Sequence, residues 1–171
     1  MPRIHALTDS QAADARPIID AVRTKLGMVP NIIRTLAHSP AALRGYLALS
    51  EALAAGRLNA AERESVALAV GQANACGYCL SAHTLMAKGA GLSPDEVMAA
   101  RQGEGSALAA FARKVTTTRA ALSTQEIADA RAMGLSDEQI VEVLAHVALN
   151  TLTNYVNHIA ATEIDFPVVA V

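Results

Sequence analysis

Hydrophobic residues recur every three or four positions along almost the whole chain, with polar residues between them. This spacing places the hydrophobic side chains on one face of an α-helix. Alternating β-branched runs bounded by turn residues, the pattern of strands, are absent except in the short tail 166–171. The sequence therefore predicts an all-α fold.

Turn and capping residues divide this pattern into eight or nine helices. Asn59 with Glu62, and Ser123 with Glu126, have the spacing of capping boxes. Elsewhere glycine marks helix ends, and serine followed by proline marks helix starts. The expected helices are 17–26, a short one from 31, 40–56, 59–71, 75–88, 94–103, 106–121, one from 124, and 137–163.

The length and composition predict one domain that associates with copies of itself. The chain has 171 residues, enough for a single core, and we expect one domain over 1–171 with its core in 17–165. Hydrophobic residues reach 52% while aromatic residues make up only 3%. Such small side chains give each helix little area to bury, so apolar surface is left for a second subunit. We expect a homo-oligomer.

Charge and hydropathy argue against nucleic-acid and membrane partners. The formal net charge is −2, and charged residues make up 18% of the chain, so the chain should not attract phosphate backbones or acidic lipids. Residues 1–17 lack the apolar segment of a signal peptide, and no run approaches the roughly 18 apolar residues of a membrane span. We expect a cytoplasmic protein.

The candidate chemistry lies in "ANACGYCLSAH", residues 73–83, which contains both cysteines of the chain. On a helix, with Cys76 at 0°, Cys79 lies at roughly 300° and His83 at roughly 340°. The three side chains thus share one face. In a reducing compartment such a pair is more often redox-active or metal-binding than a permanent crosslink, and a histidine beside it can accept a thiol proton.

Glu64 joins this group if the chain reverses between them. In one unbroken helix Glu64 would lie about 18 Å from Cys76 along the axis. Gly71 and Asn74 suit the end of one helix and the cap of the next. A turn near Asn74 would bring Glu64 level with His83 and would put Cys76 in the first turn of the new helix. We therefore expect a redox motif over 64–83.

This arrangement resembles a known signature. Glu64, eleven intervening residues, "CGYC" and then His83 after three more residues resembles the Glu/CxxC/His pattern of the alkylhydroperoxidase D family, within the carboxymuconolactone decarboxylase-like superfamily. The stretches "LGMVPNIIRTLAHSPAALRGYLALSEAL" and "GLSPDEV" also resemble its peroxidase-related branch. The resemblance covers roughly 17–165 and is strongest over 27–97.

The resemblance implies a thiol-dependent peroxidase, an oxidoreductase that reduces small hydroperoxides. It implies an all-helical fold, assembly into dimers, trimers or hexamers, and no metal, haem or other cofactor beyond a redox-active Cys76–Cys79 disulfide. It assigns Cys79 as the attacking thiolate, Cys76 as the resolving thiol, His83 as the proton acceptor and Glu64 as the group that orients His83. It also implies a dithiol reductant protein, either lipoyl-carrying or thioredoxin-like.

The order in which the two sulfurs react stays open from the residues alone. Cys79 has the i, i+4 relation to His83, whereas Cys76 has the more favourable place at the helix start. Tyr78 is a departure from the family, because some members carry a histidine just before the second cysteine. A tyrosine, with a pKa of about 10, does not readily accept a proton at neutral pH, although its hydroxyl can donate a hydrogen bond.

Three other functions compete with the peroxidase prediction. Two cysteines, a histidine and a glutamate can together bind zinc, although this helical chain has ample core without a metal. Decarboxylase or isomerase chemistry on a lactone acid is known in the superfamily, but it has no evident use for a dithiol. A non-enzymatic, redox-sensing helical protein would form the disulfide without turning over peroxide.

A polar stripe in the last expected helix has two interpretations. His146, Asn150, Asn154 and His158 repeat every four residues in a segment otherwise rich in Leu, Val and Ala. They either line the dithiol pocket or form a hydrogen-bonded seam between helices or subunits. The seam is favoured because buried polar side chains require partners.

Overall fold

The computed structural model describes all 171 residues, and its regular secondary structure is entirely helical. Nine α-helices follow a short 3₁₀ turn, which confirms the all-α prediction with eight or nine helices. Residues 166–171, the one segment with a strand-like pattern, form no strand. The elements are η1 (Ala13–Ala15), α1 (Arg16–Leu26), α2 (Asn31–Leu36), α3 (Pro40–Ala54), α4 (Ala60–Ala73), α5 (Gly77–Gly89), α6 (Pro94–Gln102), α7 (Ala107–Thr118), α8 (Thr124–Ala132) and α9 (Asp137–Ala160).

Most helix starts lie where the capping residues predict them, but α5 begins two residues later than expected, with Cys76 and not Asn74 as its N-cap, and three helix ends come early, including that of α3 at Ala54. Capping boxes open α4 at Asn59 and α8 at Ser123, with both reciprocal hydrogen bonds present. At the other ends, α7 stops at Thr118 and α9 at Ala160, about three residues before the expected ends. The reason is local, because Arg119 and Ala161 adopt left-handed backbone with φ of 55° and 50°.

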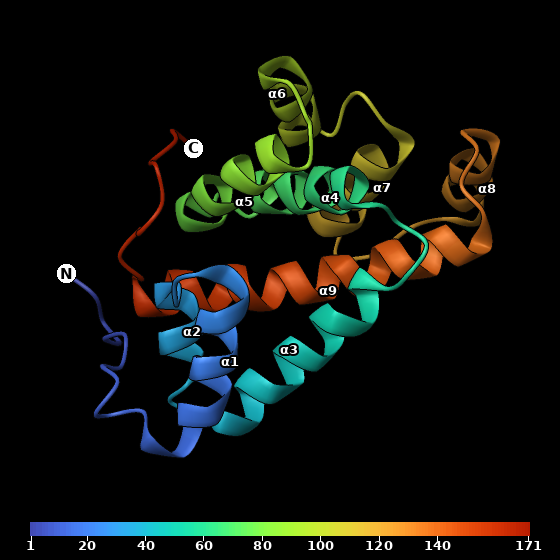
Figure 1. Cartoon of the computed structure of the whole chain (residues 1–171). Coiled ribbons are helices and arrows are strands. Elements are labelled where there is room, and N and C mark those ends of the chain that lie inside the picture. The colour runs from blue at the N-terminus through green and yellow to red at the C-terminus, as the bar shows by residue number, and fades with distance from the viewer.

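The longest helix, α9, runs through the middle of the molecule (Figure 1). On one side it packs against α4, α5 and α7, and on the other against α2 and α3. The redox motif lies on α4 and α5, so it is close to the boundary between the two groups of helices. This position lets residues from α1, α2, α3 and α9 approach the cysteines.

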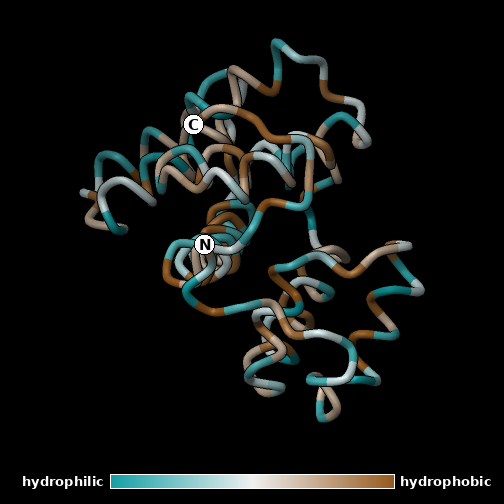
Figure 2. The backbone as a smooth tube through the Cα atoms, turned by 90° about the vertical axis from the view of Figure 1, so that its left-hand side faces the viewer, coloured by the Kyte–Doolittle hydropathy of each residue, from teal (hydrophilic) through white to brown (hydrophobic).

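Two large buried clusters follow this division. The first joins α4, α7, α8 and α9, and the second joins α1, α2 and α3 to Cys76, Tyr78 and Cys79 of the redox motif. Figure 2 shows hydrophobic and hydrophilic stretches alternating along the helices, as expected for amphipathic segments with one buried face. No helix combines the length and the apolar character needed to traverse a lipid bilayer.

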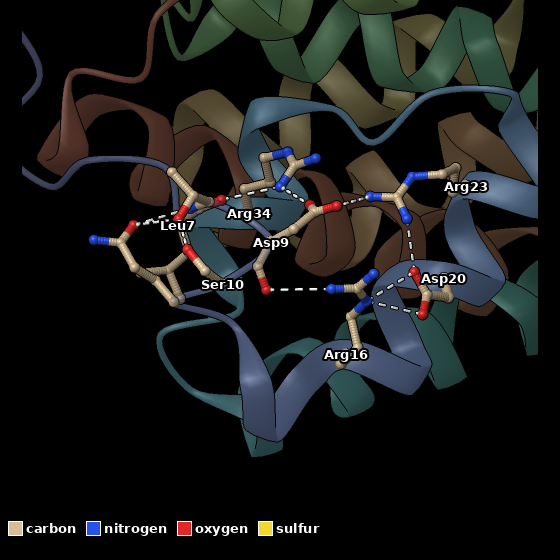
Figure 3. A network of polar contacts seen from close by, with 9 residues as sticks. Leu7, Asp9, Ser10, Arg16, Asp20, Arg23 and Arg34 are labelled. Atoms are coloured by element: carbon tan, nitrogen blue, oxygen red, sulfur yellow. Dashed lines mark hydrogen bonds and ion pairs between the residues drawn. The ribbon is translucent and has the colours of Figure 1, made fainter.

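An ion-pair network joins α1 and α2 to the N-terminal segment (Figure 3). Asp9 accepts hydrogen bonds from Arg34 of α2 and Arg23 of α1, both at 2.7 Å, and Arg23 also pairs with Asp20 at 2.6 Å. The hydrogen bond from Arg34, followed by the charges of the neighbouring arginines, lowers the pKa of Asp9. The network thereby holds the two helices that form one wall near the cysteines.

An apolar stripe remains exposed along α9. Its members follow one another at intervals of three or four residues, so they share one face of the helix: Val141, Leu144, Ala148, Leu152, Tyr155 and Ile159. A stripe of this kind is the surface that self-association would cover. The expected homo-oligomer stays a prediction.

Candidate dithiol site

The chain reverses between α4 and α5 at Asn74, as the sequence predicts. Helix α4 ends at Ala73, and Cys76 is the N-cap of α5. Between them Ala75 adopts left-handed backbone with φ of 51°, a conformation that costs an L residue roughly 1–2 kcal/mol. The turn is held by backbone hydrogen bonds, including that from Cys76 N to Gly71 O at 2.9 Å.

The two cysteines form a disulfide at the start of α5. Cys76 caps the helix with its sulfur, because its Sγ accepts a hydrogen bond from the backbone N–H of Cys79 at 3.3 Å. Cys79 lies in the first turn of the helix. The residues are only 2% and 3% exposed, so a reactant must approach the sulfur atoms through a cavity.

Glu64 and His83 meet across the antiparallel pair of α4 and α5. The Oε2 of Glu64 lies 2.8 Å from the Nδ1 of His83. An ionised carboxylate only accepts hydrogen bonds, so Nδ1–H is the donor and Nε2 is left free to exchange a proton. The spacing argument thus placed the two residues correctly. Their catalytic roles, like those of the cysteines, stay predictions.

A cavity of about 450 Å³ opens beside Cys79 and His83. Thirteen of its 19 lining residues are hydrophobic, so it suits an apolar ligand better than water or ions. The lining residues come from α1, the loop between α1 and α2, α2, α3, α5 and the C-terminal segment, and α9 contributes Thr153 and Asn157. Neither Cys76 nor Glu64 lines the cavity. Of the four predicted site residues, two face it and the other two are each bonded to one of these.

Tyr78, between the two cysteines, joins the redox motif to two distant segments. Its hydroxyl donates a hydrogen bond to Asp165 Oδ1 at 2.7 Å and accepts one from Ile32 N at 3.2 Å. Its ring packs edge-to-face on Phe166, with centroids 5.6 Å apart. Burial, together with the carboxylate of Asp165, raises the pKa of Tyr78. The residue therefore stays neutral, which agrees with its predicted role as a hydrogen-bond donor.

The sequence argument missed Tyr46, a residue of α3 that lines the cavity with Cys79 and His83. Burial is the main cause that raises the pKa of Tyr46, and the nearby charge of Glu64 raises it further. Its hydroxyl is thus a neutral group in the cavity wall. Its helix is remote in sequence from the motif, and only the folded chain brings it there.

Two of the four residues of the polar stripe on α9 form the predicted seam, and none of the four lines the cavity. The Oδ1 of Asn154 accepts a hydrogen bond from Asn74 Nδ2 at 2.9 Å, and the Nε2 of His158 donates to Asn74 O at 2.8 Å. Asn150 bonds within its own helix, to His146 O. Asn154 and His158 therefore hold the turn between α4 and α5 in place, whereas the Nε2 of His146 is buried without a hydrogen bond.

The four residues of the alternative zinc site are not grouped as metal ligands. No three His, Cys, Asp or Glu side chains are grouped so that they could hold a metal ion. The two sulfurs are bonded to each other, and the carboxylate of Glu64 is taken by His83. The zinc alternative thus finds no support in this arrangement.

Comparison with known proteins identifies the family. The model of the carboxymuconolactone decarboxylase family matches residues 40–124, which include Glu64, both cysteines and His83. The chain belongs to the carboxymuconolactone decarboxylase family. Sequence comparison with curated proteins gave no match.

Solved structures confirm an AhpD-like fold for this family member. The alkylhydroperoxidase AhpD core, a peroxidase-related protein from Ralstonia eutropha JMP134, is 26% identical with a TM-score of 0.72, over 95% of this chain and 93% of that chain. A peroxidase-related protein from Silicibacter sp. TM1040 is 24% identical with a TM-score of 0.78, over 94% and 92%. The debrominase Bmp8 is 25% identical with a TM-score of 0.78, over 95% and 92%.

Proposed function

We propose that the protein reduces organic hydroperoxides through a Cys76–Cys79 dithiol/disulfide cycle, with His83 and Glu64 managing the proton. The observation that carries this proposal is the position of one disulfide sulfur and a carboxylate-paired imidazole in the wall of the same apolar cavity. The similarity to the AhpD core from Ralstonia eutropha supports it.

The cycle starts from the reduced dithiol. The Cys79 thiol gives its proton to Nε2 of His83, and Glu64 stabilises the resulting imidazolium through Nδ1–H. The thiolate then attacks the terminal oxygen of the hydroperoxide. An S–O bond forms, the O–O bond breaks, and the alkoxide leaves with the proton from His83 as an alcohol. The sulfenic acid on Cys79 condenses with the Cys76 thiol, which gives the disulfide and one water.

Cys79 is the attacking residue in this proposal because it lines the cavity and Cys76 does not. It is also one helical turn from His83, on the same face of α5. The Sγ of Cys76 is turned instead toward the backbone at the helix start, where it accepts the N–H of Cys79. This position suits the resolving thiol, which reacts only after the sulfenic acid has formed on Cys79.

A dithiol donor completes the cycle by reducing the disulfide. Because both cysteines are buried, the donor thiol has to enter the cavity. A dihydrolipoyl arm is long, narrow and apolar, so it fits this route better than the surface of a folded thioredoxin-like protein. We therefore propose a lipoyl-carrying protein as the reductant.

The cavity predicts a preference for organic hydroperoxides over hydrogen peroxide. With a dithiol donor, kcat/KM for cumene hydroperoxide should exceed that for hydrogen peroxide by about tenfold or more, since burying an aromatic ring contributes more than about 1.4 kcal/mol. Steady-state assays on the purified protein measure both. Peroxide turnover that survives alkylation of both thiols would contradict the proposal.

A variant that narrows the cavity tests its part in this preference. Leu47 lines the cavity on α3, whereas Leu49 on the same helix is exposed outside it. Leu47→Trp should lower kcat/KM for cumene hydroperoxide by about tenfold and affect hydrogen peroxide less. Leu49→Trp is the matched control and should change neither. Equal losses of kcat/KM for both peroxides in Leu47→Trp would contradict a role of the cavity in this preference.

Reductive dehalogenation is a second candidate, favoured by the fold shared with a debrominase that was crystallised with 2,3,4-tribromopyrrole. The same dithiol would supply two electrons. A carbon–bromine bond would be replaced by a carbon–hydrogen bond, bromide would leave, and the two thiols would become the disulfide. Bromide release from a brominated pyrrole that outpaces peroxide turnover would favour this candidate.

A further inference from the structure

A buried amide on α9 contacts the sulfur of Cys79. The Nδ2 of Asn157 lies 3.3 Å from Cys79 Sγ, and this is the one hydrogen bond that this sulfur receives. Cys76 Sγ has a different donor, the backbone N–H of Cys79. Each sulfur of the disulfide thus has its own donor, and only that of Cys79 comes from a side chain in a remote element.

The other end of the same amide has no partner. Asn157 is 6% exposed, and its Oδ1 is buried without a hydrogen bond. Buried polar atoms are nearly always paired, so an unpaired one calls for an explanation. Asn157 also lines the cavity beside Cys79. The amide thus keeps its nitrogen on the sulfur even though its oxygen is left buried without a partner.

The orientation of the amide follows from the chemistry of sulfur. A thiolate or disulfide sulfur carries no hydrogen and only accepts, so the nitrogen of Asn157 belongs toward Cys79 and the oxygen away from it. An N–H bond to a charged acceptor is stronger than one to a neutral acceptor. The contact thus favours the thiolate of Cys79 over its thiol.

We propose that Asn157 is a catalytic residue of the peroxidase reaction: its Nδ2–H holds the sulfur of Cys79 as the thiolate that attacks the hydroperoxide. This inference rests on the proposed function and adds a residue to it. Asn157 neither gains nor loses a proton, and the hydrogen on the terminal oxygen of the hydroperoxide stays there when the O–O bond breaks, so that it becomes the hydrogen of the sulfenic acid.

Several other titratable groups lie close to Cys79 and also influence its titration. His83 and Tyr78 of α5, Tyr46 of α3 and Lys25 of α1 line the same cavity, and Glu64 acts through His83. None of these residues is replaced in the Asn157 variants. A change in the Cys79 titration then reports the loss of the amide contact.

The test measures the Cys79 titration midpoint in the reduced Cys76→Ser variant, where Cys79 is the only thiol. Thiolate absorbance or the pH dependence of alkylation gives the midpoint. Asn157→Leu should raise it by about one to two pH units, the expected size of a lost hydrogen bond to a charged group. Asn157→Asp keeps the shape of the side chain and puts an anion beside the sulfur, so it should raise the midpoint at least as much.

Asn150→Leu is the matched control. Asn150 is also a buried asparagine on α9, it bonds only within its helix, and it does not line the cavity. This variant should leave the midpoint unchanged. An unchanged midpoint in both Asn157 variants would overturn the inference, and the Asp variant alone decides if the Leu variant does not fold.

Turnover provides a second readout that a merely structural residue would not reproduce. With Cys76 restored, Asn157→Leu should lower kcat/KM for cumene hydroperoxide about tenfold or more at neutral pH, and the loss should shrink as the pH rises above the new midpoint. A loss that is constant with pH would contradict the thiolate role. The midpoint is measured without peroxide, so it remains informative even if the protein proves to have no peroxidase activity.

Discussion

Replacing Cys79 by serine is expected to lower peroxide turnover by more than about 10³-fold, because it removes the nucleophile itself. The substitution is nearly isosteric, so the cavity and the Glu64–His83 pair should remain. Steady-state consumption of cumene hydroperoxide with a dithiol donor measures the loss. The chain has only two cysteines, and no third thiol can replace Cys79.

Cys76→Ser is the partner variant that separates attack from resolution. Without the Cys76 thiol the disulfide cannot form, so steady-state peroxide turnover should also stop. Cys79 should still react once with peroxide. Mass spectrometry after substoichiometric peroxide should therefore find a sulfenate on Cys79 in Cys76→Ser and none in Cys79→Ser. The opposite pattern would mean that Cys76 attacks the peroxide and Cys79 resolves. Full activity in both variants would contradict the thiol mechanism.

The second large effect is expected at the proton-handling pair. His83→Ala should lower kcat/KM by about 10²–10⁴-fold, the usual contribution of a positioned acid or base. Glu64→Gln keeps a side chain of the same shape but cannot stabilise the imidazolium, so the loss should be smaller, about 10–100-fold. The steady-state assay of the cysteine variants applies here too.

Two controls make this result specific to the pair. His38 and Glu51 lie outside the cavity, so His38→Gln and Glu51→Gln should keep the activity of the parent protein. Glu64→Gln activity equal to that of the parent would contradict the role of the Glu64 charge in stabilising the His83 imidazolium. The 2.8 Å contact would then be a structural ion pair.

The fold and the paired residues were predictable from the sequence because their signals are local. Helical periodicity needs only a dozen residues, and capping boxes need four. The pairing of Glu64 with His83 required one further step, a turn between two adjacent helices. Asn74 gave that signal, and α4 does end there.

The cavity was not predictable because its walls come from segments far apart in the chain. Tyr46 is 33 positions before Cys79, and Asn157 is 78 positions after it. The polar stripe drew attention to Asn154 and His158, which hold the turn, whereas the residue that contacts sulfur is immediately adjacent to His158. On a helix, one position is a rotation of about 100°, and only packing decides which face meets the cysteines.

The most direct test of the thiol cycle is an anaerobic titration of the reduced wild-type protein with cumene hydroperoxide. One equivalent per chain should consume both thiols, form the Cys76–Cys79 disulfide and release one equivalent of the alcohol. Thiol counting, mass spectrometry and chromatography of the alcohol report these three quantities on the same sample. Two free thiols and intact hydroperoxide after prolonged incubation would contradict the account.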